Sequence, residues 1–255
     1  MLTSRTEIAT ALCEISRRAG AEILVVYGRA DHGVRSKEDG SPVTEADSAA
    51  SSIILAGLGS ALPGVDVVCE ESDKPDRAGE RFILVDPLDG TKEFITRNGE
   101  FTVNIALVEG GRPVVGVVFA PAMDRLFVGW MDDDRGHAYE EREGEKRLIT
   151  ARAPRDALVA VVSRSHADAR TDAYLERLKI GARIGVGSSL KLCMIARGEA
   201  DVYPRLGRTM EWDTAAGHAV VAAAGGSVTC LDGTPLRYGK PGWENPDFVV
   251  RGRGS

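Results

Sequence analysis

The sequence predicts a mixed α/β protein in which an α+β half is followed by an α/β half. In the first half, two segments with helical spacing precede several apolar segments of strand length, which Gly, Pro and Asp separate. In the second half, apolar segments of strand length alternate with helical ones, which is typical of an α/β arrangement. We place the boundary near residue 152, so that residues 1–152 form one unit and residues 153–255 the other.

The first half opens with two helices. Ser4 and Glu7 have the spacing of a capping box, and apolar residues then recur at helical spacing over residues 8–26. After a polar loop, Thr44 and Asp47 have the same capping spacing and begin the second helix. Asp47 is therefore expected in the first helical turn.

Apolar segments bounded by turn residues predict the strands that follow. In the first half these are residues 65–69, 82–85, 103–108, 114–120 and 126–131. The charged segment 132–147 is expected to be a solvated hairpin or loop. In the second half we expect strands at residues 158–162 and 183–186. Helices are expected at residues 167–178, from Ser188 or Ser189 to Arg197, and at residues 211–224.

Composition and charge exclude several classes of protein. The net charge of −6 and the pI near 5.4 argue against a protein that binds nucleic acid or anionic membranes nonspecifically. We expect neither a signal peptide nor a transmembrane segment. The 4 cysteines have no zinc-site or redox-motif spacing, which favours buried thiols and a cytoplasmic location.

The segment Asp86-Pro-Leu-Asp-Gly-Thr91 places two carboxylates and a hydroxyl directly after the apolar residues 82–85. Mg²⁺ prefers oxygen ligands and is usually held by one or two carboxylates together with a substrate phosphate. Asp86, Asp89 and Thr91 therefore suit a magnesium and phosphate site. An ordinary polar turn after a core strand fits the same residues.

Further carboxylates lie where other predicted elements begin or end. Asp47 and Asp213 each stand near a helix start, and Glu70 follows a strand. Each has an ordinary explanation, since acidic residues are favourable in the first helical turn and solvated strand ends are common. If they converge on Asp86 and Asp89, the group could hold ions for in-line phosphoryl displacement.

Three motifs together resemble the signature of the inositol monophosphatase superfamily of Mg²⁺-dependent, lithium-sensitive phosphatases. They are Glu70-Glu-Ser72, Asp86-Pro-Leu-Asp-Gly-Thr91 and Trp212-Asp-Thr-Ala-Ala-Gly217. Other segments resemble its bacterial 3′(2′),5′-bisphosphate nucleotidase branch, the CysQ type; they are residues 86–107, 163–168, 187–191, 203–205 and 212–220. The resemblance extends from the first helix to near Val249, and it implies a layered α-β-α-β-α sandwich of the sugar-phosphatase type.

The resemblance also implies a site with two or three Mg²⁺ ions. In this site Glu70 and Asp86, with the backbone carbonyl of Leu88, bind the first ion. A second ion is bound by Asp86, Asp89 and Asp213. The ions would lower the pKa of bound water and reduce the repulsion between the nucleophile and the phosphate.

Catalytic and substrate-binding residues follow from the same resemblance. It implies that Asp47 and Thr91, with help from Glu70, align and deprotonate the attacking water, and that the N–H groups of Gly90 and Thr91 contact phosphate at a helix start. The remaining substrate contacts are Ser163, His166, Ser188, Lys191 and Arg205. Lys191 suits the second, uncleaved phosphate, although a lysine in the middle of a helix is more often simply solvated.

The implied activity is removal of the 3′-phosphate of adenosine 3′,5′-bisphosphate, which yields AMP and phosphate and clears a by-product of sulfate assimilation. 3′-Phosphoadenylyl sulfate is a further candidate substrate. Two alternatives stay open: an inositol-1-phosphate or fructose-1,6-bisphosphate phosphatase, and a catalytically silent nucleotide or metal sensor. A second cationic subsite near Ser163, His166 and Lys191 would distinguish the first, and loss of a metal ligand the second. The expected partner is a small phosphorylated nucleotide, and the chain is expected to be a monomer or homodimer.

Overall fold

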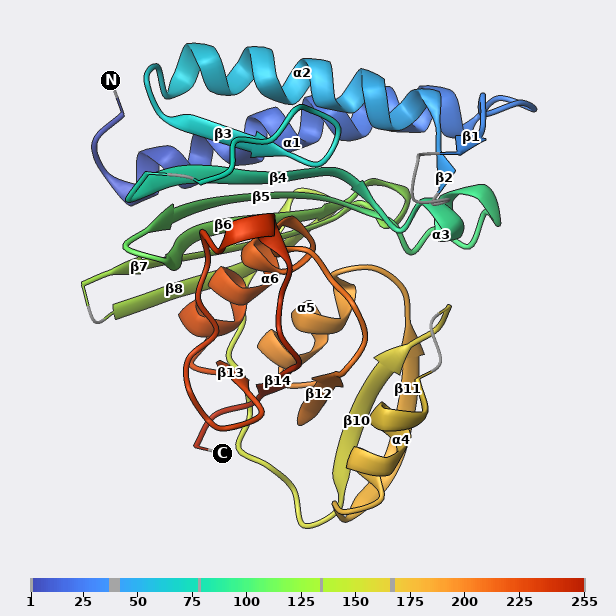
Figure 1. Ribbon diagram of the computed structural model, residues 1–255, viewed down its shortest axis with the longest axis vertical. Coiled ribbons are helices and arrows are strands. Elements are labelled where there is room, and N and C mark those ends of the chain that lie inside the picture. The colour runs from blue at the N-terminus through green and yellow to red at the C-terminus, as the bar shows by residue number, and fades with distance from the viewer. Residues whose placement is uncertain (1, 37–41, 78, 134, 166–167, 255) are drawn as a thin grey trace.

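Helices and sheets alternate in five layers, from α1 and α2 at one end of the molecule to α4 at the other (Figure 1). This order confirms the layered α-β-α-β-α sandwich. The computed structural model describes residues 2–36, 42–77, 79–133, 135–165 and 168–254. The helices are α1 (Arg5–Tyr27), α2 (Glu45–Ala61), α3 (Thr91–Ile95), α4 (Ala169–Leu175), α5 (Leu190–Ala196) and α6 (Glu211–Ala223), with short 3₁₀ turns η1 (Pro121–Met123) and η2 (Pro241–Trp243).

Seven strands form the larger sheet, and they pair in the order in which they follow one another along the chain. They are β3 (Asp66–Cys69), β4 (Arg81–Asp89), β5 (Thr102–Glu109), β6 (Arg112–Ala120), β7 (Arg125–Asp132), β8 (Arg135–Arg142) and β9 (Glu145–Leu148). Only the first pair, β3 with β4, is parallel, and the later pairs are antiparallel. Two further short strands, β1 (Arg35–Ser36) and β2 (Pro42–Val43), pair separately within the predicted polar loop.

Alternation along β5 places apolar side chains on both faces of this sheet, because successive residues of a strand point to opposite sides. Val103, Ile105 and Leu107 join the core beneath α1 and α2. Ala106 and Val108 join the core on the side of α5 and α6. The sheet is thus buried on both faces, with a helical layer on each.

Glycines let α6 pack closely on the second face. A Cβ added at Gly116 on β6 would lie 2.3 Å from the Ala216 carbonyl oxygen, and one at Gly129 on β7 would lie 2.5 Å from the Val220 Cα. These distances are too short for any side chain, so the small residues predicted along α6 and the glycines of the sheet together allow the close approach. This packing fixes the first turn of α6, which carries Asp213, relative to β4.

The smaller sheet has five strands in the order β11-β10-β12-β14-β13. They are β10 (Leu158–Ser163), β11 (Ile180–Val186), β12 (Val202–Arg205), β13 (Ser227–Cys230) and β14 (Phe248–Arg251). Strands β12, β13 and β14 were not predicted. Their pairing joins segments that are far apart in the sequence, which local patterns do not reveal. The chain passes between the sheets after β9, and a division into two units at residue 152 stays a prediction.

Three other predictions need correction. The strand expected at residues 82–85 continues as β4 to Asp89. The two aspartates therefore lie in the last part of β4, where its pairing with β5 is irregular, rather than after the strand ends. The charged segment 132–147 is a hairpin, as one of the two expected forms, but Glu140 within it is buried against Arg125 and Arg197 instead of solvated. The helix expected at 167–178 is the shorter α4.

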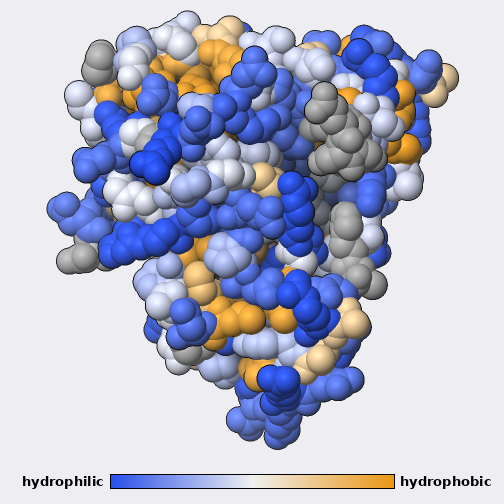
Figure 2. Space-filling view, in the orientation of Figure 1, coloured by the Kyte–Doolittle hydropathy of each residue, from blue (hydrophilic) through white to orange (hydrophobic). Residues whose placement is uncertain are grey.

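Hydrophilic side chains predominate on the face seen in Figure 1, with smaller hydrophobic patches between them (Figure 2). Among the described residues, no helix combines the length and the apolar composition that a membrane crossing requires. The cysteines of the chain are free thiols, and three of them, Cys13, Cys69 and Cys193, are buried as expected.

Candidate active site

Glu70 and Asp86 are brought together by the parallel pairing of β3 and β4. Cys69 stands opposite Val85 in this pair, so the next residues along each strand are also neighbours. The Glu70 N–H donates to the Val85 carbonyl oxygen at 3.0 Å, which continues the pairing by one residue. The carboxyl ends of two parallel strands therefore present adjacent carboxylates.

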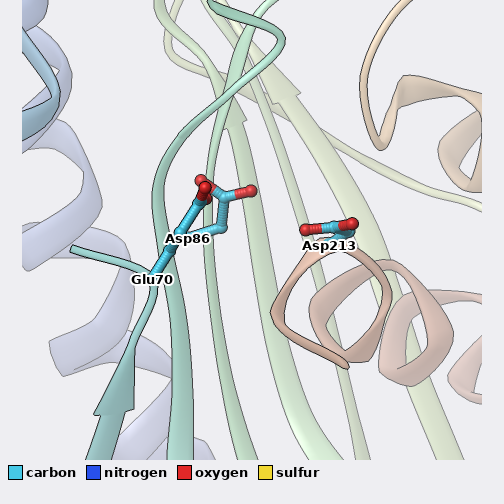
Figure 3. A group of neighbouring side chains, drawn as sticks. All are labelled: Glu70, Asp86 and Asp213. Carbon is cyan, nitrogen blue, oxygen red and sulfur yellow. The ribbon is translucent and has the colours of Figure 1, made fainter. Parts of the chain in front are cut away.

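Asp213 reaches the same place from the first turn of α6. Figure 3 shows Glu70 and Asp86 on neighbouring strand ends, with Asp213 facing them from the start of the helix. One carboxylate oxygen from each of the three residues lies within 4.8 Å of the other two. The Asp213 Oδ2 accepts the Met210 N–H at 2.8 Å, which holds the side chain at the helix start.

Burial and mutual repulsion make these carboxylates unfavourable as a bare cluster. Burial raises the pKa of Asp86 well above its usual value, and the nearby charges of Glu70, Asp89, Asp213 and Asp47 raise it further. The pKa of Asp213 is raised well above its usual value by the same causes, burial first. Such a set of oxygen donors fits a divalent cation, which would supply the missing positive charge.

The two aspartates at the end of β4 have different hydrogen-bond partners. Asp86 Oδ1 accepts the Leu88 N–H at 3.0 Å, and the pairing with β5 is interrupted between Asp86 and Asp89. Asp89 Oδ2 accepts the Ser188 hydroxyl and the Ser189 N–H, each at 2.6 Å. Gly90 then turns the chain into α3 with a φ of 91°, which few residues other than glycine adopt.

Thr91 and Asp47 meet beside the carboxylates. The Thr91 hydroxyl lies 3.4 Å from Asp47 Oδ1 and 3.4 Å from the Leu88 carbonyl oxygen. Asp47 Oδ2 accepts both the N–H and the hydroxyl of Thr44 at 2.7 Å, as the capping box predicts. The buried carboxylate is thereby oriented, with Oδ1 toward Thr91.

A cleft of about 750 Å³ contains most of the predicted residues. Those on its wall are Glu70, Asp86, Leu88, Asp89, Gly90, Thr91, Ser163, Ser188, Lys191, Arg205 and Asp213. Asp47 is 2% exposed and contacts the wall through Thr91. His166 lies outside the described residues. The sequence therefore located the cleft, and the structure brings together residues from both sheets.

One part of the cleft wall, which we call the cationic wall, carries Lys191 and Arg205. Lys191 is 7% exposed, so it is a buried lysine rather than a solvated one, and its Nζ donates to the Ser188 carbonyl oxygen. It also lies over the Tyr203 ring, 5.6 Å from the ring centroid. The Lys191 pKa is lowered to about 8, chiefly by burial; the charge of Asp89 opposes this shift and the positive charge of Arg205 adds to it.

Several residues of the cleft were not identified from the sequence. Lys74 lies over the Trp212 ring, 5.0 Å from its centroid, and donates to the Glu70 carbonyl oxygen at 2.6 Å. Arg208 also lines the cleft and pairs with Glu244 at 3.3 Å. Arg208 lies three positions after the predicted Arg205 in the sequence, and this proximity was a signal that could have identified it. Nothing in the spacing of Lys74 indicated the cleft.

Comparison with known proteins adds a family to this geometry. Residues 4–248 match the model of the inositol monophosphatase family. The 3′(2′),5′-bisphosphate nucleotidase CysQ of Escherichia coli K12 is 48% identical over 245 residues, which cover 94% of this chain and 97% of the relative.

Solved structures show the same fold. The crystal structure of CysQ from Bacteroides thetaiotaomicron is 36% identical, with a TM-score of 0.83 and a coverage of 97% of both chains. The inositol monophosphatase of Anabaena is 26% identical, with a TM-score of 0.78, and the match covers 98% of this chain and 92% of that one.

Proposed function

The chain belongs to the inositol monophosphatase family, and we propose that it is a Mg²⁺-dependent 3′(2′),5′-bisphosphate nucleotidase. Its substrate is adenosine 3′,5′-bisphosphate, from which it removes the 3′-phosphate to give AMP and inorganic phosphate. 3′-Phosphoadenylyl sulfate is a further substrate of the same type. Support comes from the CysQ relatives, one of which is 48% identical over nearly the whole chain.

The carboxylates of the cleft are proposed to hold the magnesium ions. Glu70 and Asp86, with the Leu88 carbonyl oxygen, would hold one ion, and Asp86, Asp89 and Asp213 would hold a second. When bound, the ions lower the pKa of water and offset the charge that develops on the phosphate. Support comes from the oxygen-only donor set and from burial that a cation would compensate.

Thr91 and Asp47 are proposed to orient the attacking water and take up its proton. A threonine hydroxyl is a weak base by itself, so it needs a carboxylate to receive the proton. The Asp47 Oδ1 is 3.4 Å from this hydroxyl, and its other oxygen is held by Thr44. Glu70 assists at the same edge, and the N–H groups of Gly90 and Thr91 contact the transferred phosphate.

The cationic wall is proposed to bind the phosphate that is not cleaved. Lys191, Arg205 and Ser163 line the same cleft as the carboxylates. A protonated lysine with little solvent around it forms strong charge-assisted contacts with phosphate. Ser188 also lines the cleft, but its hydroxyl donates a hydrogen bond to Asp89. Its contribution to substrate binding would therefore come from other atoms.

One observation carries the proposal: three converging carboxylates and a buried lysine face the same cleft. A single-phosphate sugar substrate has no need for the second subsite, which favours the nucleotide over inositol-1-phosphate. A silent sensor is disfavoured because Thr91, Asp47 and the carboxylates are all present in contact geometry. Fructose 1,6-bisphosphate has two phosphates, and it is the rival that requires direct measurement.

The test is phosphate release with Mg²⁺ from three substrates at equal concentrations: adenosine 3′,5′-bisphosphate, inositol-1-phosphate and fructose 1,6-bisphosphate. We expect kcat/KM to be highest for the nucleotide, and EDTA to abolish release. A higher kcat/KM for either sugar phosphate would overturn the substrate assignment while leaving the metal site. Release from none of them would contradict the enzymatic proposal.

A further inference from the structure

A group of buried polar side chains lies beside Asp89; two of them, Ser188 and Ser189, also line the cleft, and the other two do not. Thr102 and Asn104 come from β5, and they are 0% and 1% exposed. Ser188 and Ser189 precede α5, and they are 8% and 2% exposed. These four residues, which we call the donor chain, connect the larger sheet with the segment that leads out of the smaller one.

The shortest contacts of the donor chain run in one sequence, and a longer contact of 3.4 Å also joins Thr102 Oγ1 to Asn104 Oδ1. Asn104 Oδ1 lies 2.7 Å from Ser189 Oγ, which lies 2.8 Å from Thr102 Oγ1. Thr102 Oγ1 contacts Ser188 Oγ, and Ser188 Oγ lies 2.6 Å from Asp89 Oδ2. Four hydrogen bonds therefore link five side chains, and Asp89 is at one end.

The protons available determine the direction of these bonds. Asp89 as a carboxylate only accepts, so the Ser188 proton is donated to it. Thr102 must then donate to Ser188, and Ser189 must donate to Thr102. Three hydroxyl protons are used in this way, and none is left for the contact between Ser189 and Asn104.

Asn104 can supply the fourth proton. Its Nδ2 is buried without a hydrogen-bond partner among the described residues, and the amide oxygen and nitrogen of an asparagine are assigned from their surroundings. Exchanging the two atoms places the Nδ2 beside Ser189 Oγ, as a donor. This orientation satisfies every contact in the sequence and removes the unpaired buried donor.

We propose that the donor chain positions Asp89, with hydrogen bonds directed from Asn104 through Ser189, Thr102 and Ser188 onto Asp89 Oδ2. This inference rests on the proposed function, in which Asp89 is a magnesium ligand. Both donors to Asp89, the Ser188 hydroxyl and the Ser189 N–H, use Oδ2. Among the described atoms, Oδ1 is thereby left available to the ion.

The backbone of Ser188 supports a positioning role. Its φ is 53°, in the left-handed region that serine rarely adopts. Such conformations persist where surrounding contacts over-determine them, and they cluster at functional sites. Here the contacts with Thr102 and Asp89 hold the residue in place. Partners that orient a metal ligand typically change metal affinity or activity 10- to 100-fold when they are removed.

Thr102→Val and Thr102→Ser make a matched pair for the test. Valine keeps the shape of threonine and removes the hydroxyl, whereas serine keeps the hydroxyl. Thr102 is 0% exposed and does not line the cleft, so neither change removes a substrate contact. The first readout is Mn²⁺ binding by electron paramagnetic resonance without substrate, and the second is the Mg²⁺ concentration that gives half-maximal turnover.

We expect Thr102→Val to weaken Mn²⁺ binding and to raise the half-maximal Mg²⁺ concentration by about 10- to 100-fold. Thr102→Ser should stay within about 3-fold of the wild type in both measurements, because the serine hydroxyl can donate and accept the same hydrogen bonds as the threonine hydroxyl. A merely structural role would lower the melting temperature and leave metal affinity unchanged. Equal Mn²⁺ affinity in the wild type and Thr102→Val would overturn the donor chain alone.

Ser188→Gly is the second variant, in case Thr102→Val does not fold. Glycine removes the hydroxyl and accepts the positive φ without strain, so the folded state is favoured. The same weakening of Mn²⁺ binding is expected, and wild-type affinity would contradict the donor chain. If the wild-type protein itself binds no Mn²⁺, the proposed metal site fails first, and the inference fails with it.

Discussion

The Thr91 hydroxyl lies 3.4 Å from Asp47 Oδ1 across 44 residues of sequence. Asp47 belongs to the first turn of α2, and Thr91 begins α3. The capping box of α2 fixes the aspartate by occupying its other oxygen. A structural cap and a proposed catalytic carboxylate are therefore the same side chain, and its two oxygens have different partners.

Asp47→Asn separates these two roles. An asparagine oxygen can still accept from Thr44, so helix capping should persist, but the amide cannot take a proton from the threonine. We expect kcat to fall by about 10²- to 10⁴-fold, with little change in melting temperature. Steady-state kinetics and thermal unfolding check this together. Wild-type kcat would remove Asp47 from the proton path.

Asp213→Asn tests the repulsion within the carboxylate cluster. Without metal, the negative charge of Asp213 disfavours ionised Asp86, because both are buried close together. Removing it should raise the melting temperature of the protein in EDTA while abolishing turnover with Mg²⁺. The Mg²⁺-induced rise in melting temperature should also shrink. A variant that is less stable than the wild type in EDTA would contradict the claim that repulsion among these carboxylates destabilises the metal-free protein.

Lys191→Met tests the second phosphate subsite. Methionine keeps the length of the apolar stem, so the change removes mainly the charge. We expect kcat/KM for adenosine 3′,5′-bisphosphate to fall by about 10- to 100-fold, as loss of a charge-assisted hydrogen bond predicts. The fall for 3′-AMP, which lacks the second phosphate, should be much smaller. Equal losses for both nucleotides would remove Lys191 from this subsite.

The same lysine predicts a pH dependence. Its pKa is lowered to about 8 by burial, and only the protonated form attracts phosphate. In the free enzyme, kcat/KM for the bisphosphate should therefore decline as the pH rises through about 8. The profile for 3′-AMP should lack this decline, and so should the profile of Lys191→Met. Parallel profiles for the two nucleotides would contradict the assignment.

Glu140→Gln tests the buried ion pairs between β7, β8 and the end of α5. The Glu140 carboxylate lies 2.7 Å from the Arg125 Nε and 3.0 Å from the Arg197 Nε. Removing its charge takes this carboxylate from Arg125 and leaves Arg197 with its other partner, Glu199, which should cost about 3 kcal/mol of unfolding free energy. Urea unfolding measures the loss. Activity well below the melting temperature should be unaffected, since Glu140 does not line the cleft.

The elements with a strong local signal could be predicted from the sequence. The two capping boxes and the apolar strands of the larger sheet gave correct helices and strands, and the Asp86–Thr91 motif located the cleft. The short strands β12, β13 and β14 were not predicted. Their pairing depends on contacts with distant segments rather than on local preference.

The side chains that support the site were equally hidden. Ser188 is separated from Asp89 by 99 residues, and nothing in the local sequence relates them. The burial of Glu140 is similar: its neighbours are charged, and only the fold brings Arg125 and Arg197 to it. Local patterns thus indicated most residues of the candidate site, whereas the partners that orient them required the tertiary structure.

The most direct test of the account is to identify the products formed from adenosine 3′,5′-bisphosphate with Mg²⁺ by phosphorus nuclear magnetic resonance. If the carboxylates act on the 3′-phosphate while Lys191 holds the other one, the products are 5′-AMP and inorganic phosphate. Formation of 3′-AMP, or an unchanged substrate, would contradict the proposed arrangement of the two phosphates in the cleft.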